Sequence, residues 1–327
     1  MKYILGIDTS NYTTSVALID QDHNIIEDRR RSIKVKEGMK GIRQSEALFQ
    51  HIDNLPDLIE GLPGKYGDSI DAVCVSSRPR PVKGSYMPVF KAGMNSARLI
   101  SDALGSVLIK TSHQEGHIEA GKYIYGGGYR PDLISDDGLA VFHLSGGTTE
   151  ILFENRIIGG SKDISFGQLL DRMGAYSGYS FPAGRELDEI AVKRLKKEGS
   201  YEKIKSQTFD SFKNISKTGL EINLSGLDSQ VKRIMKDIND PGEKESIISS
   251  VFYLISLCLE TLTTELKKQY NVENVLYVGG VSSSTFIRDH ITKSMEKGEP
   301  KVLFGAPELS VDNAVGVAIV GGKEIWQ

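Results

Sequence analysis

The segment TSHQEGHIEAG, residues 111–121, holds the side chains whose types and spacing most directly suggest chemistry. His113 and His117 are four positions apart, so on a helix they lie about 40° apart on one face, as two ligands of a metal ion do. Glu115 points roughly the opposite way. A lone pair of this kind also occurs as ordinary surface polarity, and an aspartate or glutamate from elsewhere would have to supply a third ligand.

A zinc peptidase fits the same segment poorly. In the H-E-x-x-H helix of such enzymes the glutamate directly follows the first histidine and lies beside the metal. Here that position is Gln114. The residues by themselves therefore leave a metal site and plain surface polarity open, and they disfavour proteolysis.

Three turns rich in serine, threonine and glycine could bind phosphate, because they present backbone N–H groups and hydroxyls to its oxygens. Ser10 lies in the first turn and Gly280 in the third. The second turn contains Ser145, Gly146 and Gly147. Tight turns favour the same residue types for structural reasons alone, so a plain turn is the alternative interpretation at each place.

Apolar runs of strand length flank the first two turns. Residues 3–7 and 16–20 flank the first, and residues 139–145 and 150–154 flank the second. Each set predicts a strand, a polar turn and a second strand. The recurrence of this pattern suggests an internal duplication, whose two halves could hold a nucleotide from both sides.

Strand-like and helix-like segments alternate along the rest of the chain, which favours an α/β fold. Residues 246–270 are apolar on most sides and should form a long buried helix. Residues 125–132 contain three glycines and a proline and are the expected linker.

The composition is that of a globular protein, with 39% hydrophobic and 25% charged residues among 327. The net charge of −3 gives no basic footprint, so nucleic-acid contact would need a local patch or a partner. Cys74 and Cys258 lie in apolar runs and suit buried thiols in a reducing cytoplasm. No segment approaches the roughly 20 apolar residues that cross a bilayer, and the N-terminal run is too short for a signal peptide. We expect a cytoplasmic protein that does not enter a membrane.

Seven segments, in order, resemble the family of tRNA threonylcarbamoyladenosine synthases, long misnamed O-sialoglycoprotein endopeptidases. The resemblance covers nearly the whole chain, and its most specific part is H-x-E-G-H combined with a late D-N motif. The segments are GIDTSNYTTSVALID, HQEGHIEAG, LSGGTTEIL, FGQLLDRMGAYSGYSFPAGREL, LSGLDSQVKR, YVGGVSSSTFIR and SVDNAVGVA.

The resemblance implies the duplicated α/β superfold of actin-like ATPases and sugar kinases, with two mixed-sheet domains and a cleft between them. The first domain would comprise residues 1–124 and 311–327, whose final helix packs back on it. The second would comprise residues 125–310.

The resemblance also implies a metal site. His113 and His117 match the two histidine ligands of the family, and Asp312 matches its aspartate ligand. The ion would be one transition metal, iron or zinc. Ser10 and Asn11 fall where the first loop of the family contributes to the metal and phosphate region, and together with Asp8 they are the candidate catalytic residues.

For the nucleotide, the resemblance implies a site for an adenine nucleotide or an acyl-adenylate. The family passes a threonylcarbamoyl group from threonylcarbamoyl-adenylate to N6 of an adenosine in tRNA. The expected partners are therefore tRNA or another anionic acceptor, and a paralogous partner protein. The positions that match or adjoin its ribose, phosphate and adenosine contacts are Ser145, Gly146, Gly147, Asp171, Gly184, Asp188, Gly280 and Ser284.

Several positions depart from the family pattern. Tyr12 and Thr13 stand where the first loop normally has two acidic residues. Arg78 and Arg80 enter a loop that is normally small and apolar. Arginine forks bind carboxylates and phosphates in pairs of hydrogen bonds, so these changes suit an anionic acceptor. They predict a divergent paralogue that keeps the metal and nucleotide sites and has changed its acceptor chemistry.

Other functions remain as alternatives. An ATP-dependent kinase or a carbamoyltransferase on a small anionic acceptor could use the same fold, and a kinase would need an aspartate base, for which Asp8 is the candidate. A non-catalytic partner would resemble the inactive paralogue that accompanies the synthase, but that paralogue lacks the histidine pair and the aspartate. A metallopeptidase is disfavoured by the geometry given above.

Overall fold

The computed structural model describes residues 1–10, 12–35, 42–124, 128–130, 138–154, 156–296 and 300–326. The chain divides into two compact units. Unit 1 comprises Met1–Pro131 and Gly305–Gln327, and unit 2 comprises Asp132–Phe304.

Unit 1 is built on a five-stranded mixed sheet with the order β3-β2-β1-β4-β5. The first three strands are antiparallel neighbours, and β1, β4 and β5 run parallel. The hairpin predicted around residues 3–20 is therefore confirmed. The strands are β1 (Tyr3–Asp8), β2 (Thr13–Asp20), β3 (Ile25–Ser32), β4 (Ile70–Arg78) and β5 (Val107–Ser112).

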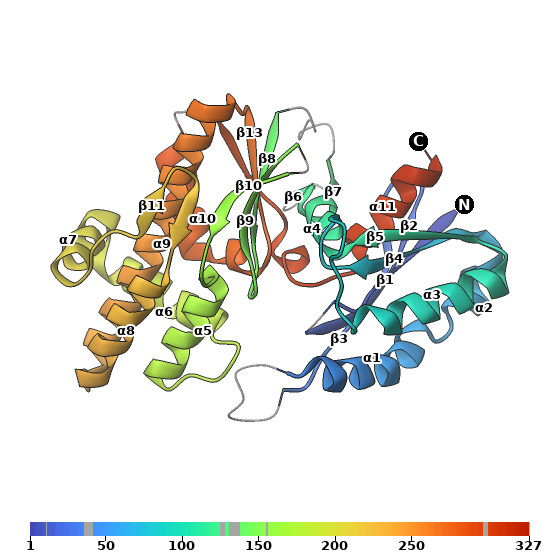
Figure 1. Cartoon of the computed structure of the whole chain (residues 1–327), viewed down its shortest axis with the longest axis horizontal. Helices are drawn as coiled ribbons and strands as arrows, with labels where there is room; N and C mark the ends of the chain where they lie inside the picture. Colours follow the sequence, from blue (N-terminus) through green and yellow to red (C-terminus); the bar gives the residue numbers. More distant parts are fainter. Residues whose placement is uncertain are drawn as a thin grey trace. The chain divides into compact units, whose positions relative to one another are not determined.

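Alternate side chains of β1 enter two separate cores. Leu5 and Ile7 pack towards α1 and α3, whereas Ile4 packs towards α11. This alternation is the period of two that a strand imposes. Figure 1 shows α1 and α3 on one side of the sheet and α4 and α11 on the other. The helices are α1 (Gln44–Ile59), α2 (Leu62–Tyr66), α3 (Phe90–Leu104), α4 (His113–Gly121) and α11 (Val315–Trp326), with 3-10 turns at Gly67–Ser69 and Pro307–Leu309.

The expected linker, residues 125–132, lies largely outside the described residues. Its described part is not free of regular structure, because Gly128–Tyr129 (β7) pairs with Tyr123–Ile124 (β6) in a short antiparallel hairpin. Gly128 has a φ of 70°, a backbone conformation that glycine adopts without strain.

Unit 2 contains a seven-stranded sheet with the order β11-β12-β10-β9-β8-β13-β14. Its last five strands repeat the order and directions of the whole sheet of unit 1, with an antiparallel meander followed by two parallel strands. This repeat confirms the predicted duplication. The strands are β8 (Leu139–Leu144), β9 (Thr149–Phe153), β10 (Arg156–Ser161), β11 (Ser216–Thr218), β12 (Glu221–Asn223), β13 (Asn274–Val278) and β14 (Lys301–Phe304).

Most helices of unit 2 pack around one long core helix, α9, and α8 packs on α5. Its bounds, Pro241–Tyr270, contain the long helix predicted for residues 246–270. The other helices are α5 (Phe166–Ser177), α6 (Gly184–Glu198), α7 (Tyr201–Ser211), α8 (Ser225–Asp237) and α10 (Thr285–Met295), with a 3-10 turn at Gly280–Ser283.

Helix α9 is long and apolar enough to cross a membrane by length and composition, so the expectation that no segment approaches that length was wrong. Its most apolar stretch is, however, 78% buried inside the protein. The hydroxyls of Ser249, Ser256 and Thr263 donate to carbonyls four residues earlier, which satisfies these polar groups within the helix. Burial of this kind is typical of a core helix in a globular unit.

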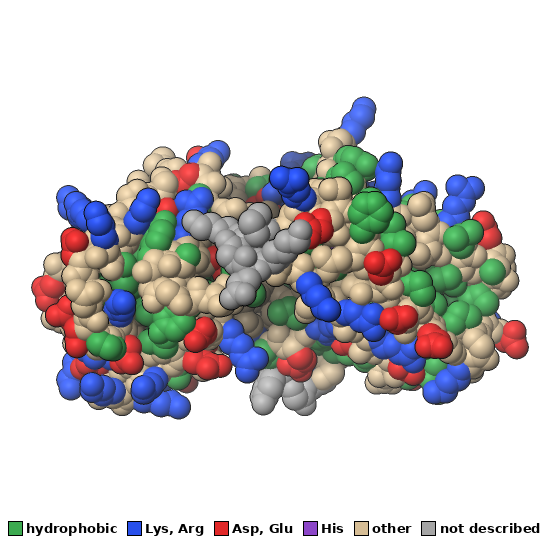
Figure 2. Space-filling view, turned by 90° about the horizontal axis from the view of Figure 1, so that it is seen from below, with side chains coloured by type: hydrophobic (Ala, Val, Ile, Leu, Met, Phe, Trp, Pro, Cys, Tyr) green, Lys and Arg blue, Asp and Glu red, His purple; other side chains and the backbone are tan. Residues whose placement is uncertain are grey.

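Lys and Arg side chains are interspersed with Asp and Glu side chains on the face shown in Figure 2. This distribution agrees with the small net charge of the chain. Any contact with a polyanion would therefore depend on a local group of basic residues.

Candidate metal centre and nucleotide-binding turns

Helix α4 starts at the histidine segment because its first turn is capped from both directions. Ser112 Oγ accepts a hydrogen bond from the backbone N–H of Glu115, and Glu115 Oε2 accepts one from the N–H of Ser112 at 2.8 Å. The hydroxyls of Ser112 and Thr111 also donate to Glu115 Oε2, at 2.6 and 3.0 Å. Such a capping box fixes where a helix begins. Glu115 is thereby held at the helix start, which counts against a peptidase that would use it as a base.

His113, His117 and Asp312 come together in unit 1. One potential ligand atom from each lies within 4.8 Å of the others. Asp312 Oδ1 is 3.3 Å from His117 Nε2 and 3.5 Å from His113 Nε2. The two imidazole rings meet edge to face, with centroids 4.4 Å apart. The geometry thus supplies the third side chain that the histidine pair lacked.

Close packing of α4 against α11 produces this meeting. A Cβ atom on Gly316 would overlap the carbonyl oxygen of Gly116, and one on Gly116 would lie 2.9 Å from Val317 Cγ2. Only glycines allow the two backbones to approach this closely. Just before α11, the amide of Asn313 donates to two carbonyls and accepts from the N–H of Gly316, which holds the turn that carries Asp312. Asn313 belongs to the D-N motif and Gly116 to H-x-E-G-H, but the sequence assigned no role to either residue, and Gly316 had only the small-residue run after Asp312 as a signal.

Asp8 lies at the end of β1, directly behind His113. Its Oδ2 is 3.0 Å from His113 Nδ1 and accepts a hydrogen bond from Ser10 Oγ at 3.0 Å. Ser76 Oγ donates to its other oxygen. Asp8 is 0% exposed, so it reaches the centre only through His113. The catalytic role expected for Asp8 stays a prediction, and in the structure its carboxylate is enclosed by residues of β4 and α4. Asn11 lies outside the described residues.

The charges of this group are strongly coupled. Burial lowers the pKa of His113, but the charge of Asp8 and the hydrogen bonds to Asp312 and Asp8 outweigh it and raise that pKa to about 10. Burial and the neighbouring charge of His113 lower the pKa of His117. Although burial opposes it, hydrogen bonds from both histidines hold the pKa of Asp312 well below its usual value.

These residues fit a transition-metal ion. His113 lies between two carboxylates, with Asp8 Oδ2 3.0 Å from Nδ1 and Asp312 Oδ1 3.5 Å from Nε2, and these surroundings favour a positive charge. A metal ion would supply that charge and would take the neutral imidazoles as ligands. Imidazole nitrogen with carboxylate oxygen is a donor set that suits iron or zinc better than magnesium.

The basic loop after β4 lies beside the start of α4. The backbone N–H of Gln114 donates to the carbonyl of Pro79 at 3.0 Å, and Arg78 pairs with Ser112 across β4 and β5. Arg78 and Arg80 are half-buried, whereas Tyr86 is 59% exposed. The backbone of this loop therefore lies next to the N-terminus of α4 within unit 1.

In unit 2, the turn between β8 and β9 packs on the start of α5. Within the turn, Ser145 Oγ accepts from the N–H of Gly147 at 3.3 Å and of Thr148 at 3.0 Å. A Cβ on Gly167, in the first turn of α5, would lie 2.6 Å from Ser145 O, whereas one on Gly146 or Gly147 would meet open space. The exposed glycines next to a helix N-terminus can receive an anion.

The third glycine turn joins this group. Gly279 has a φ of 91°, and a Cβ there would lie 2.5 Å from the carbonyl oxygen of Leu144, the residue before Ser145. Gly280, which begins the following 3-10 turn, is therefore a neighbour of the Ser145 turn. Two of the three predicted phosphate turns lie together in unit 2, and the first turn, with Ser10, belongs to unit 1.

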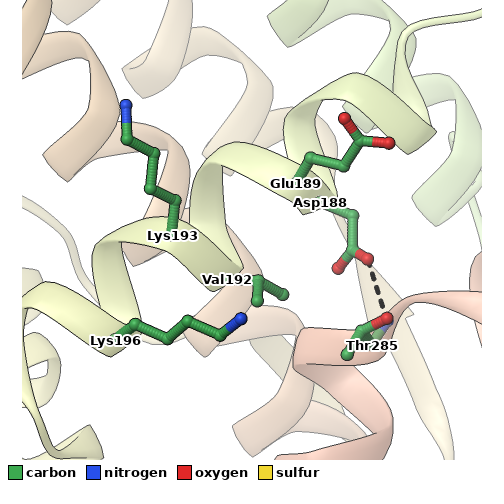
Figure 3. A pocket seen from close by; sticks show the side chains of 6 residues that line it. All are labelled: Asp188, Glu189, Val192, Lys193, Lys196 and Thr285. Atoms are coloured by element: carbon green, nitrogen blue, oxygen red, sulfur yellow. Dashed lines mark hydrogen bonds between the residues drawn. The ribbon is translucent and has the colours of Figure 1, made fainter.

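Asp188 connects α6 to the start of α10. Its carboxylate accepts hydrogen bonds from Ser284 Oγ, from the N–H of Thr285 at 2.9 Å and from the N–H of Phe286 at 3.1 Å. Figure 3 shows its bond to Thr285 at the edge of a surface pocket, with two lysines of α6 nearby. That pocket is lined by Asp188, Glu189, Val192, Lys193, Lys196 and Thr285.

Asp171 and Gly184 form a separate pair of predicted positions. Asp171 Oδ1 accepts from the N–H of Ala183 at 2.9 Å, and Gly184 begins α6 directly afterwards. Burial raises the pKa of Asp171 despite this hydrogen bond. Helix α6 thus carries Gly184 at its start and Asp188 one turn later.

The family model described as tRNA N6-adenosine threonylcarbamoyltransferase (TsaD) matches residues 24–319. A protein of that name from Thermosipho africanus is 28% identical, covering 98% of this chain and 93% of the relative. Another from Streptococcus pneumoniae is 26% identical, covering 99% and 92%.

Solved structures support the fold. Full-length HypF in its phosphate- and nucleotide-bound form matches with a TM-score of 0.60 and 12% identity, over all of this chain and 47% of that one. Component A of (R)-2-hydroxyglutaryl-CoA dehydratase from Acidaminococcus fermentans matches with a TM-score of 0.55 and 14% identity over both full chains. Likeness at this identity concerns the fold alone. The expected duplicated actin-like superfold is confirmed.

Proposed function

The chain belongs to the tRNA N6-adenosine threonylcarbamoyltransferase family, and on that premise we propose that it is a metal-dependent transferase of threonylcarbamoyl or a closely related group. One observation carries the metal dependence, namely the convergence of His113, His117 and Asp312 within 4.8 Å. The free, buried thiols of Cys74 and Cys258 suit the reducing cytoplasm in which we place the protein.

The imidazoles of His113 and His117 and the carboxylate of Asp312 would hold one iron or zinc ion. When bound, such an ion supplies Lewis acidity that can polarise an acyl carbonyl or hold a phosphate oxygen. Asp8 lies behind His113 and balances the local positive charge. The convergence of all three side chains counts against a non-catalytic partner protein, and the burial of Asp8 counts against a kinase that uses it as a base.

An adenine nucleotide or acyl-adenylate is the proposed ligand of unit 2. The open glycines of the turn at residues 145–147 would face its phosphates, next to the N-terminus of α5. Asp188, Ser284 and Asp171 are the proposed ribose and adenosine contacts. The carboxylate of Asp188 already caps α10, and its oxygens retain further lone pairs for a hydroxyl.

The reaction proposed from the family joins N6 of adenosine to the carbamoyl carbon. The bond from that carbon to the phosphate oxygen breaks, AMP leaves, and a proton departs from N6. Tyr12 and Thr13 replace the acidic pair of the first loop. This chain therefore lacks two carboxylates at that place, which supports altered acceptor chemistry in a divergent paralogue or dependence on a paralogous partner.

Arg78 and Arg80 support an anionic acceptor, because their loop adjoins the proposed metal centre. tRNA satisfies this requirement, and so does a smaller molecule with a phosphate or carboxylate. Bidentate arginine contacts would hold either one.

The test is reconstitution with the threonylcarbamoyl-adenylate-forming enzyme and tRNA, with and without a paralogous partner, followed by nucleoside analysis. We expect weak modification by this chain alone. Robust modification by the chain alone would contradict the proposal that its acceptor chemistry has changed. It would support threonylcarbamoyl transfer to tRNA, as in the rest of the family.

Metal analysis of the purified protein tests the metal separately. His117→Ala and Asp312→Ala should each lose the bound ion, and full metal content in both variants would contradict the site. Arg80→Ala should weaken acceptor binding without changing metal content.

A further inference from the structure

An imidazole that binds a metal ion uses one ring nitrogen, and the hydrogen bond of the other nitrogen decides which one faces the metal. In His113 the two nitrogens have different neighbours. Nδ1 is 3.0 Å from Asp8 Oδ2, and Nε2 is 3.5 Å from Asp312 Oδ1. Asp8 can accept a hydrogen bond from Nδ1 only when Nδ1 carries the proton. In the neutral ring, the unprotonated nitrogen is then Nε2, which lies on the side of Asp312.

Asp8 is itself held rigidly. Ser10 Oγ donates to Oδ2 at 3.0 Å, and Ser76 Oγ donates to Oδ1. The donors come from the segment after β1, from β4 and from α4, and the carboxylate is completely buried. Ile7 pairs with Val75 in the parallel β1–β4 ladder, so the residues that follow them, Asp8 and Ser76, lie beside each other. A buried carboxylate held from several elements has little freedom to rotate.

We propose that Asp8 is a positioning residue, which holds His113 Nδ1–H and so presents Nε2 to the metal ion, and that Ser76 fixes Asp8 in this orientation. The inference rests on the proposed metal site. It gives β1 and β4 a direct part in that site, although neither strand contributes a ligand. Without the carboxylate, the His113 ring could turn or adopt its other tautomer, and binding would then have to select the correct arrangement.

The test is titration of the metal-free, full-length protein with Co²⁺, followed by its visible absorption spectrum. Asp8→Asn preserves the shape of the side chain and removes its charge. We expect the affinity for Co²⁺ to fall about 10- to 100-fold, as is usual when a carboxylate behind a histidine ligand is lost. The Co²⁺ bands should also change in position or intensity, because the ligand orientation changes.

Asp20→Asn is the matched control. Asp20 is a buried aspartate in the same sheet, at the far end of β2, where it accepts from the N–H groups of Asp22 and Asn24. This substitution should leave both Co²⁺ affinity and spectrum unchanged. A loss of affinity as large as that of Asp8→Asn would mean that general destabilisation explains both, and it would overturn the inference.

The remaining outcomes separate the two proposals. Failure of the unaltered protein to bind Co²⁺ would contradict the proposed metal site itself. If the unaltered protein binds Co²⁺ and Asp8→Asn binds it with the same affinity and the same spectrum, only the positioning role is contradicted. If Asp8→Asn does not fold, Ser76→Ala decides, because it retains the carboxylate and removes one donor. A several-fold loss of affinity with a shifted spectrum supports the inference, and unchanged values overturn it.

Discussion

Substitution of Gly316 by alanine should disrupt the candidate metal centre, although Gly316 is not one of its ligands. The new Cβ would overlap the carbonyl oxygen of Gly116, and it would lie 2.7 Å from the carbonyl carbon of Gly116 and 2.8 Å from the nitrogen of Ala120. All three are backbone atoms of α4 and cannot rotate away. To bring the carbonyl carbon alone to an ordinary contact of 3.4 Å requires a shift of roughly 0.7 Å, and the overlapping oxygen requires more, so the helices must separate by more than roughly 0.7 Å.

Such a shift is large for a metal site, where distances are held to about 0.2 Å. His117 follows Gly116 directly, and Asp312 lies four residues before Gly316. A separation of the two helices would therefore lengthen the distance of 3.3 Å between His117 Nε2 and Asp312 Oδ1. Overpacking of this kind costs about 1–3 kcal/mol. For a unit of this size, each kcal/mol lowers the melting temperature by about 2–4 °C.

The assay combines thermal unfolding of the metal-free protein with metal analysis of the purified protein. Gly64→Ala in α2 is the control, because a Cβ there meets no atom within 4 Å and its backbone is unstrained. It should be neutral or slightly stabilising. A Gly316→Ala protein with unchanged melting temperature and metal content would refute the account of how α4 and α11 build the centre.

Four further results are expected. The metal-free protein should lose stability to urea as the pH rises from 6.5 towards 10, because folded His113 keeps a proton that the unfolded chain releases, and His113→Gln should remove that slope. It should also lose stability as the pH falls below 3.8, because the pKa of Asp312 is lowered on folding. Glu115→Ala should cost about 0.5–2 kcal/mol at the start of α4 yet keep the metal, and loss of metal would contradict its capping role. Gly146→Asp should weaken nucleotide binding about tenfold or more by charge repulsion, and an unchanged dissociation constant would count against the phosphate turn.

Several parts of the fold were predictable because they are encoded locally. The alternation of apolar residues defines β1 and β2 and the second hairpin, and the spacing of His113 and His117 places both side chains on one face of α4. The same reasoning identified residues 246–270 as a long buried helix. It failed on the membrane criterion, because α9 meets that criterion by length and apolar composition while 78% of its most apolar stretch is buried inside the protein.

The sequence by itself determined that the chain alternates strands and helices, repeats one hairpin pattern and carries a histidine pair fit for a metal. It pointed to Asp312 only through a family resemblance, since nothing local connects residues nearly 200 positions apart. The tertiary structure decided that Gly116 and Gly316 bring α4 and α11 into contact, and that Asp8 lies behind His113. The physical reason is that periodicity depends on neighbours in the chain, whereas a distance between ligand atoms depends on how closely two backbones pack.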